Sequence, residues 1–117
     1  MNRLKYICQN DQTDCGPACI ASIFGYYGLI LSIAKIREIA GTDREGTNAL
    51  GLKKTCEHYG FDCKVVEVDQ SVLTPALLTP CVAHLLIDNT LLHYVVIKKI
   101  YDNHIIIIDP AKGIMVL

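Results

Sequence analysis

Four residues of this sequence have side chains that could together perform nucleophilic chemistry on a carbonyl group. Cys15 follows the polar run QNDQTD and precedes a long apolar stretch, so it opens a predicted helix. A helix N-terminus favours negative charge, and therefore the thiolate, the nucleophilic form of cysteine. Gln9 precedes it, and His93 and Asp109 follow in the second half of the chain. A thiolate, a proton-exchanging imidazole, an orienting carboxylate and an oxyanion-binding amide suffice for acyl transfer.

The predicted strands can bring His93 and Asp109 together. His93 opens one apolar run, and Asp109 closes the next, where Pro110 stops the ladder. The two runs form a hairpin around the turn at 102–103, and neighbouring strands lie about 5 Å apart. We therefore expect Asp109 to orient the His93 imidazole. The backbone N–H of Cys15 and the side-chain amide of Gln9 are the expected oxyanion donors.

Each of these residues also has a purely structural interpretation. A cysteine at a helix start is more often structural than catalytic, a strand-edge histidine is commonly solvated, and Asp-Pro is a frequent turn signal. His84 lies within an apolar strand run, as a core histidine or as a rival base. We favour His93 because a carboxylate-bearing strand follows it, and we expect His58 and His104 at the surface.

Helices in the first half and strands in the second must position these residues. Apolar residues at three- and four-residue spacing predict helices over 15–27, 32–40 and 49–59, with N-caps at Asp14, Ser32 and Asn48 and ends at Gly28, Gly41 and Gly60. From Phe61 the period shifts toward two. This predicts an irregular piece over 71–78, a turn at 88–90, and strands over 62–68, 81–88, 92–99, 104–109 and 114–117. The order predicts an α+β domain with N-terminal helices packed on a C-terminal antiparallel sheet.

Composition restricts the class of protein. The 117 residues are 51% hydrophobic and 20% charged, which fits one domain, residues 1–117, with a packed core. The formal charge of −1 and the scattered basic residues give no footprint for nucleic acid or an anionic membrane. No apolar run approaches the roughly 20 residues of a membrane span, and the N-terminus lacks a signal-peptide core. We therefore expect a cytoplasmic chain.

The six cysteines do not predict a disulfide framework or a metal site. Without a secretion signal, disulfides are disfavoured. Zinc sites need paired ligands at short loop spacings, which the sequence lacks. Cys19 lies one helical turn after Cys15, but the spacing is not Cys-x-x-Cys, so we interpret Cys19 as a core residue. We expect no cofactor and no metal, and most of the cysteines buried as small apolar residues.

The motifs around these residues resemble a known family. The run from Gln9 to Cys19, continuing to Tyr26-Tyr27-Gly28, is similar to the cysteine motif of the bacteriocin-processing peptidases. His93-Tyr94-Val95-Val96-Ile97 is similar to the histidine motif of that family, and Ile108-Asp109-Pro110 to its aspartate motif. These are papain-like domains that remove double-glycine leader peptides. The resemblance covers nearly the whole chain.

The resemblance implies a papain-like fold and a concrete chemistry. Cys15 would be the nucleophile, His93 the general base and then acid, Asp109 its orienting group and Gln9 part of the oxyanion hole. Members usually form the N-terminal cytoplasmic domain of an ABC exporter, so the implied partners are a precursor's leader peptide and the exporter's membrane and nucleotide-binding domains. Tyr94 and the stretch 20–31 are candidates for leader binding or for the core.

Two alternative functions and the extent of the domain stay open at this point. The chain could be a non-catalytic leader-docking domain, since some members have lost the cysteine, although this chain retains it. It could also be a papain-like transferase that passes the acyl group to an amine. Family domains commonly extend some tens of residues beyond the aspartate motif, so the 117 residues are either a domain trimmed at its C-terminus, a short stand-alone member or a partial sequence.

Overall fold

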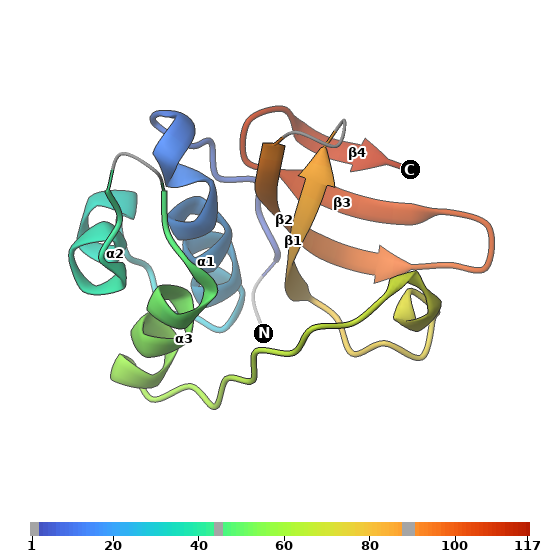
Figure 1. Cartoon of the computed structure of the whole chain (residues 1–117), viewed down its shortest axis with the longest axis horizontal. Coiled ribbons are helices and arrows are strands. Elements are labelled where there is room, and N and C mark those ends of the chain that lie inside the picture. Colours follow the sequence, from blue (N-terminus) through green and yellow to red (C-terminus); the bar gives the residue numbers. More distant parts are fainter. Residues whose placement is uncertain (1–2, 44–45, 88–90) are drawn as a thin grey trace.

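The computed structural model places a layer of helices beside an antiparallel sheet (Figure 1). It describes residues 3–43, 46–87 and 91–117, so the predicted turn at 88–90 lies outside the described residues. The elements are two short 3₁₀ helices, three α-helices and four strands: η1 Gln12–Asp14, α1 Cys15–Tyr26, α2 Ile33–Ala40, α3 Ala49–His58, η2 Gln70–Val72, β1 Cys81–Ile87, β2 Leu91–Ile100, β3 Ile105–Asp109 and β4 Gly113–Val116.

The sheet is a simple meander that brings the end of β3 to the start of β2. Its strand order is β1-β2-β3-β4, with every neighbouring pair antiparallel. Val96 pairs with Ile108 and Ile97 with Ile107, and the register shifts between Ile97 and Lys99. A shift of this kind is a β-bulge, which re-aims the side chains that follow it. The predicted α+β arrangement, helices first and antiparallel strands second, is confirmed.

Two of the three helices begin and end as their sequence signals predict. The Ser32 hydroxyl accepts from the backbone N–H of Lys35, and Gly41 ends α2 with a φ of 71°. The Asn48 side chain accepts from the Gly51 N–H at 2.8 Å and caps α3. Short polar side chains satisfy N–H groups that the first helical turn leaves unpaired, and glycine tolerates the left-handed exit.

The start of α1 differs from the prediction. Asp14 precedes the helix, but its side chain makes no cap hydrogen bond to α1. It accepts instead from the backbone N–H of Asp11 at 3.1 Å, while the Asp11 carboxylate accepts from the Thr13 N–H at 2.8 Å. This reciprocal capping box closes η1, which leads directly into Cys15. The prediction was incomplete because the cap belongs to an extra turn before α1.

The helices and the sheet share one core, and a second core lies on the opposite face of the sheet. The first contains Cys19, Phe24 and Ile36 from the helices with Val96 and Ile108 from the strands. The second is built on Val95, Ile97, Ile100 and Ile107 and is covered by Leu73 and Leu77. Alternate residues of β2 thus serve the two faces, as strand geometry requires.

The predicted strand over 62–68 is wrong. No strand forms there, and η2 is the next element after α3. Val65, Val66 and Val68 are all exposed, at 48%, 70% and 56%. Apolar spacing of two favours a strand only where a neighbouring chain pairs with it, and this segment pairs with no strand among the described residues.

The expectation that most cysteines are buried is also wrong. All six are free thiols, but only Cys19 and Cys56 are fully buried, and Cys8 is exposed. The other three are half-buried: Cys15 at the start of α1, Cys63 in the segment after α3 and Cys81 at the start of β1. Across the described part of the chain, no helix combines the length and the apolar character needed to cross a membrane.

Candidate active site

His93 and Asp109 form a buried pair at the end of the sheet next to α1. His93 Nε2 lies 2.8 Å from Asp109 Oδ1, and the two residues are only 8% and 4% exposed. A carboxylate accepts hydrogen bonds and cannot donate them, so Nε2 of His93 donates. Nδ1 is then the ring nitrogen available to exchange a proton, and the carboxylate fixes both the tautomer and the plane of the ring.

The turn after β3 holds the carboxylate in place. Asp109 Oδ1 also accepts from the backbone N–H of Ala111 at 2.8 Å. The carbonyl of Pro110, between them, accepts from the backbone N–H of Gln9 at 2.9 Å. This second bond ties the loop before α1 to the end of β3. It therefore places Gln9 one residue away from the orienting carboxylate.

Gln9 carries an unsatisfied polar atom at this junction. Within the described residues, its side-chain Oε1 is buried and has no hydrogen-bond partner. Buried polar atoms are nearly always paired in folded proteins, so an orphan indicates a group kept for something other than the fold. Gln9 is thus held by its backbone N–H, while its side-chain oxygen has no partner among the described residues.

Cys15 begins α1 and is half-buried. The next residue, Gly16, packs against the ring of Tyr94, since a Cβ built on Gly16 would lie 3.2 Å from Tyr94 Cδ2. Tyr94 directly follows His93 in β2, so this contact sets the start of α1 against the strand that carries His93. No hydrogen bond joins the Cys15 thiol to His93 in the part of the chain that the structure describes.

An ion pair behind Cys15, not foreseen from the sequence, fixes the turn before it. The Arg37 guanidinium of α2 donates to Asp14 and, at 2.8 Å, to the hydroxyl of Thr13. Asp14 is 1% exposed, so its charge is compensated almost entirely by Arg37 and by the Asp11 N–H. The hydrogen bond to Asp14 is the main cause that raises the pKa of Arg37. Only the helix-cap signal of Asp14 was visible in the sequence, since its partner lies 23 residues away.

His84 and Tyr94 form a stacked pair beside the site. Their rings lie 3.9 Å apart and nearly parallel, and the two residues face each other in the β1–β2 register. The Tyr94 hydroxyl is buried without a hydrogen-bond partner among the described residues. Burial raises the Tyr94 pKa, and the nearby Cys15 and Cys19 thiols add to the effect. His84 is exposed rather than in the core, and partial desolvation together with the proximity of His93 lowers its pKa.

The contact with a carboxylate distinguishes His93 from His84. His93 is hydrogen-bonded to Asp109, whereas the contact of His84 is its stack on Tyr94. His58 is exposed, as expected. His104 is half-buried, contrary to expectation, because it stacks on Tyr101 and its Nδ1 lies 2.6 Å from Asn103 Oδ1.

The two buried thiols, Cys19 and Cys56, are poorly suited to nucleophilic chemistry. Burial raises the pKa of Cys19 well above its ordinary value, with smaller effects from Cys15 and Asp109. Burial and the neighbouring Cys63 raise the pKa of Cys56 to about 12. Both thiols therefore stay protonated at neutral pH. Among the described residues, no cluster of three His, Cys, Asp or Glu side chains could hold a metal ion.

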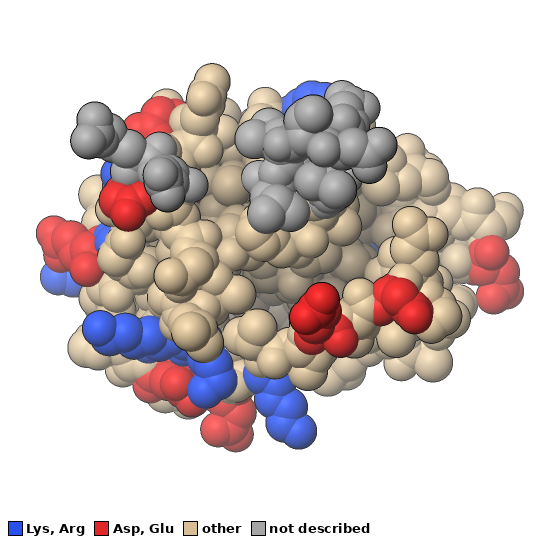
Figure 2. Space-filling model, viewed as in Figure 1, with Lys and Arg blue, Asp and Glu red and all other residues tan. Residues whose placement is uncertain are grey.

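The stretch 20–31 divides between core and surface. Ile20 and Phe24 are buried in the core under the sheet, whereas Tyr27 is 50% and Ile30 90% exposed. On the face shown in Figure 2, most Lys and Arg side chains lie along the edges, and two acidic groups lie within the face to the right of its middle.

The predicted residues come from three elements that pack against one another, α1, β2 and β3. Cys15 starts α1, His93 lies near the start of β2, and Asp109 ends β3, with Gln9 tied to the next residue. A sequence comparison decides the family. A model of the peptidase C39 family matches residues 3–117. The chain belongs to the peptidase C39 family.

Relatives of this C39 domain are much longer proteins. The lactococcin-G-processing and transport ATP-binding protein LagD of Lactococcus lactis subsp. lactis is 43% identical over 110 residues, 93% of this chain and 16% of LagD. The transport/processing ATP-binding protein ComA of Streptococcus pneumoniae strain R6 is also 43% identical over 110 residues, 93% of this chain and 15% of ComA. The C39 chain therefore spans about one sixth of the length of these relatives.

Solved structures confirm the fold of the C39 domain. The peptidase domain of Streptococcus ComA, a bifunctional ABC transporter of a quorum-sensing pathway, matches with a TM-score of 0.89 at 32% identity, covering 98% of this chain and 86% of that one. A double-glycine-motif protease of an AMS/PCAT transporter, in complex with the leader peptide, matches with 0.85 at 28% identity, covering 100% and 84%. The predicted papain-like α+β fold is confirmed.

Proposed function

We propose that this chain is a single cysteine endopeptidase domain that removes double-glycine-type leader peptides from precursors of bacteriocins or signalling peptides. The observation that carries the proposal is the buried His93–Asp109 pair, whose side chains lie 2.8 Å apart. The pair lies at the end of the sheet, and α1, which begins with Cys15, packs against this sheet in a chain of the C39 family. Support for the substrate class comes from the structural neighbour that is a double-glycine-motif protease bound to a leader peptide.

In the proposed reaction Cys15 is the nucleophile. His93 accepts the thiol proton at Nδ1, and the Cys15 sulfur attacks the carbonyl carbon of the last leader glycine. The backbone N–H of Cys15 and the Gln9 side-chain amide donate to the resulting oxyanion. His93 returns the proton to the departing amine of the cargo, which leaves a thioester between the leader and Cys15.

A water molecule then completes the cycle. His93 takes one of its protons while the oxygen attacks the thioester carbonyl, and collapse of the second oxyanion releases the leader carboxylate and restores the thiol. Asp109 stabilises the imidazolium form of His93 in both halves of the reaction, because its carboxylate accepts from Nε2. The position of Gln9 supports its assignment to the oxyanion hole, because its backbone N–H donates to the Pro110 carbonyl beside Asp109 and its side-chain Nε2 can donate to an oxyanion.

The partners in this proposal follow from the relatives. Their names describe transport and processing ATP-binding proteins, in one case for lactococcin G. We assign this chain to the cytoplasmic side of such an exporter, where it acts on the leader before export. The membrane and nucleotide-binding parts of the exporter are the proposed partners.

Cleavage of a synthetic precursor tests the proposal. The substrate is an amphipathic leader ending in Gly-Gly and followed by a short cargo, with products identified by mass spectrometry. We expect cleavage after the second glycine, its loss in Cys15→Ala and His93→Ala, and its retention in Cys63→Ala, which removes a thiol remote from the site. A matched substrate with Val-Val in place of Gly-Gly should remain intact.

Three results would contradict the peptidase assignment. Full activity of Cys15→Ala would exclude the proposed nucleophile. Binding of the leader by the folded wild-type protein without any cleavage would show a docking domain. Transfer of the leader to an added amine, in preference to water, would show a transferase. Alkylation gives an independent check, because a catalytic Cys15 should react with iodoacetamide faster than the exposed Cys8 in the same molecule.

A further inference from the structure

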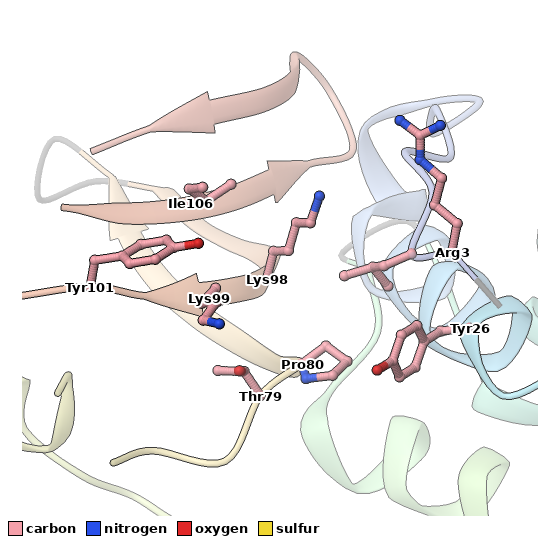
Figure 3. Close-up of a pocket in the computed structure, with 9 residues that line it drawn as sticks. Arg3, Tyr26, Thr79, Pro80, Lys98, Lys99, Tyr101 and Ile106 are labelled. Atoms are coloured by element: carbon pink, nitrogen blue, oxygen red, sulfur yellow. The ribbon is translucent and has the colours of Figure 1, made fainter. Parts of the chain in front are cut away.

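A second concave site lies at the other end of α1 and β2. A cavity of about 410 Å³ opens between the N-terminal segment, the end of α1, the approach to β1 and the end of β2. Its lining residues are Arg3, Leu4, Tyr26, Thr79, Pro80, Lys98, Lys99, Tyr101 and Ile106 (Figure 3). Tyr26 lies 11 residues after Cys15 on α1, which is roughly 16 Å along the helix axis. The cavity is therefore separate from the candidate active site.

Three cationic residues line this cavity, and no acidic residue does. Arg3, Lys98 and Lys99 contribute the cations, and none of the nine lining residues is Asp or Glu. Within residues 3–43, 46–87 and 91–117, none of the three makes an ion pair, although Lys35, Arg37 and Lys53 do. Unpaired cations gathered around a cavity attract an anion with more than one charge.

The bulge in β2 is what places two consecutive lysines at one cavity. In a regular strand, Lys98 and Lys99 would point to opposite faces of the sheet. Because Ile97 pairs with Ile107 while Lys99 pairs with Ile106, Lys98 is the extra residue and both side chains line the same space. Lys98 extends from the strand toward the segment that carries Arg3 (Figure 3). Lys99 Nζ is held 5.5 Å above the Tyr101 ring.

Hydroxyl groups and apolar walls complete the lining. Tyr26, Thr79 and Tyr101 each carry a hydroxyl that can donate a hydrogen bond to an anionic oxygen. Leu4, which is 6% exposed, and Pro80 form part of the wall. The volume lies within the range of roughly 300–1,000 Å³ typical of small-molecule sites. The cavity could therefore hold further atoms of a ligand besides its anionic group.

We propose that this cavity binds a diphosphate group, either as free pyrophosphate or as the polyphosphate part of a nucleotide. A diphosphate carries several negative charges and many acceptor oxygens, which match three cations and three hydroxyl donors. A lysine ammonium group interacts with phosphate as a compact point charge, so it does not require one particular orientation of the anion. An arginine–carboxylate pair, in contrast, is favoured by two parallel hydrogen bonds in one plane. The inference is independent of the proposed peptidase function.

Titration calorimetry and amide chemical shifts test the site. Inorganic pyrophosphate and, separately, ATP are added to the whole chain in magnesium-free buffer of low ionic strength. We expect pyrophosphate to bind and to shift the amides of Thr79 and of residues 98–101 most strongly. Lys98→Gln with Lys99→Gln should weaken binding about tenfold or more, because two charged donors are lost. Tyr101→Phe, which removes one hydroxyl, should weaken it less.

A charge-matched control separates the cavity from general electrostatics. Lys54→Gln with Lys64→Gln changes the net charge equally at two exposed positions outside the cavity, and should leave binding unchanged. Equal weakening in both double variants would overturn the proposal. So would the absence of binding by both pyrophosphate and ATP, or shifts confined to other residues, provided that circular dichroism shows folded variants. Tighter binding of ATP than of pyrophosphate would assign the site to a nucleotide. Equal binding of the two would assign it to the free anion.

Discussion

Arg37 of α2 donates to the buried carboxylate of Asp14, the residue that immediately precedes Cys15. The pair joins α2 to η1, the turn that leads into α1. Because Asp14 is almost fully enclosed, its charge depends on this one guanidinium and on the N–H of Asp11. The position of Cys15 is therefore set partly by a residue that no catalytic motif contains.

Arg37→Met should destabilise the chain and misplace Cys15. Removal of the guanidinium leaves a buried carboxylate without its counter-charge, so we expect the free energy of unfolding to fall by about 2 kcal/mol. This loss is smaller than the roughly 3–5 kcal/mol expected for a fully buried pair, because the Arg37 side chain is 31% exposed. Urea denaturation measures this. Lys35→Met, which breaks an exposed pair on the same helix, should change stability by less than about 0.5 kcal/mol.

The double variant Asp14→Asn with Arg37→Met sharpens this test. It removes both charges, so it should be more stable than Arg37→Met alone. An equal or lower stability would mean that the burial of an unpaired carboxylate is not the cause of the loss.

Asp109→Asn should preserve the fold but depress cleavage of the leader substrate. An asparagine can still accept from the Ala111 N–H, but it cannot stabilise an imidazolium, and its amide can impose the wrong tautomer on His93. We expect kcat/KM to fall by about a hundredfold to ten-thousandfold. Asp102→Asn, in the exposed β2–β3 turn, should retain normal activity. A change of less than threefold in Asp109→Asn would remove Asp109 from the mechanism.

Gly51→Ala and Gly25→Ala should have opposite effects on stability. A Cβ on Gly51 would lie 2.2 Å from the backbone oxygen of Ala40, so α2 and α3 would have to separate. We expect a loss of about 2 kcal/mol or more. A Cβ on Gly25, within α1, would meet no heavy atom within 4 Å, and alanine should stabilise the helix by about 0.5–1 kcal/mol. Thermal unfolding of the two variants gives the comparison, and shifts of the same sign would contradict it.

His84 should titrate below its ordinary value of 6.5 and make stability depend on pH. Burial and the neighbouring His93 lower its pKa in the folded chain, so the unfolded chain binds the proton more readily. The free energy of unfolding should therefore fall as pH drops through about 6.5 toward the lower folded pKa. NMR titration of the imidazole signals measures the pKa directly. His84→Gln should flatten this part of the pH profile, and an unchanged profile would rule out His84 as its source.

Local signals in the sequence were sufficient for most of the helix boundaries. Ser32, Asn48 and Gly41 act through neighbours within four residues, so their roles can be predicted without the fold. The hairpin that joins His93 to Asp109 is also local, since the two strands are separated by one short turn. For this reason the pair could be placed together from sequence alone.

Features that depend on distant partners were not predictable. The strand expected over 62–68 lacks a neighbour, and nothing in its own residues reveals that. From the sequence alone, Arg37 is indistinguishable from an exposed helix cation, because its partner Asp14 becomes its neighbour only when α2 packs beside η1. The cavity that joins Arg3 to the two lysines of β2 requires both the bulge and the return of the sheet to the N-terminal segment.

The hydrogen bond from Gln9 to Pro110 has a consequence for folding. It joins residues 101 positions apart, near the two ends of the described chain. Contacts of such high sequence separation form late, because a long loop must close before they can stabilise anything. During synthesis on the ribosome, the loop ahead of Cys15 can reach its final position only after the third strand has left the exit tunnel. A nascent chain should thus acquire its helices well before it acquires an organised site.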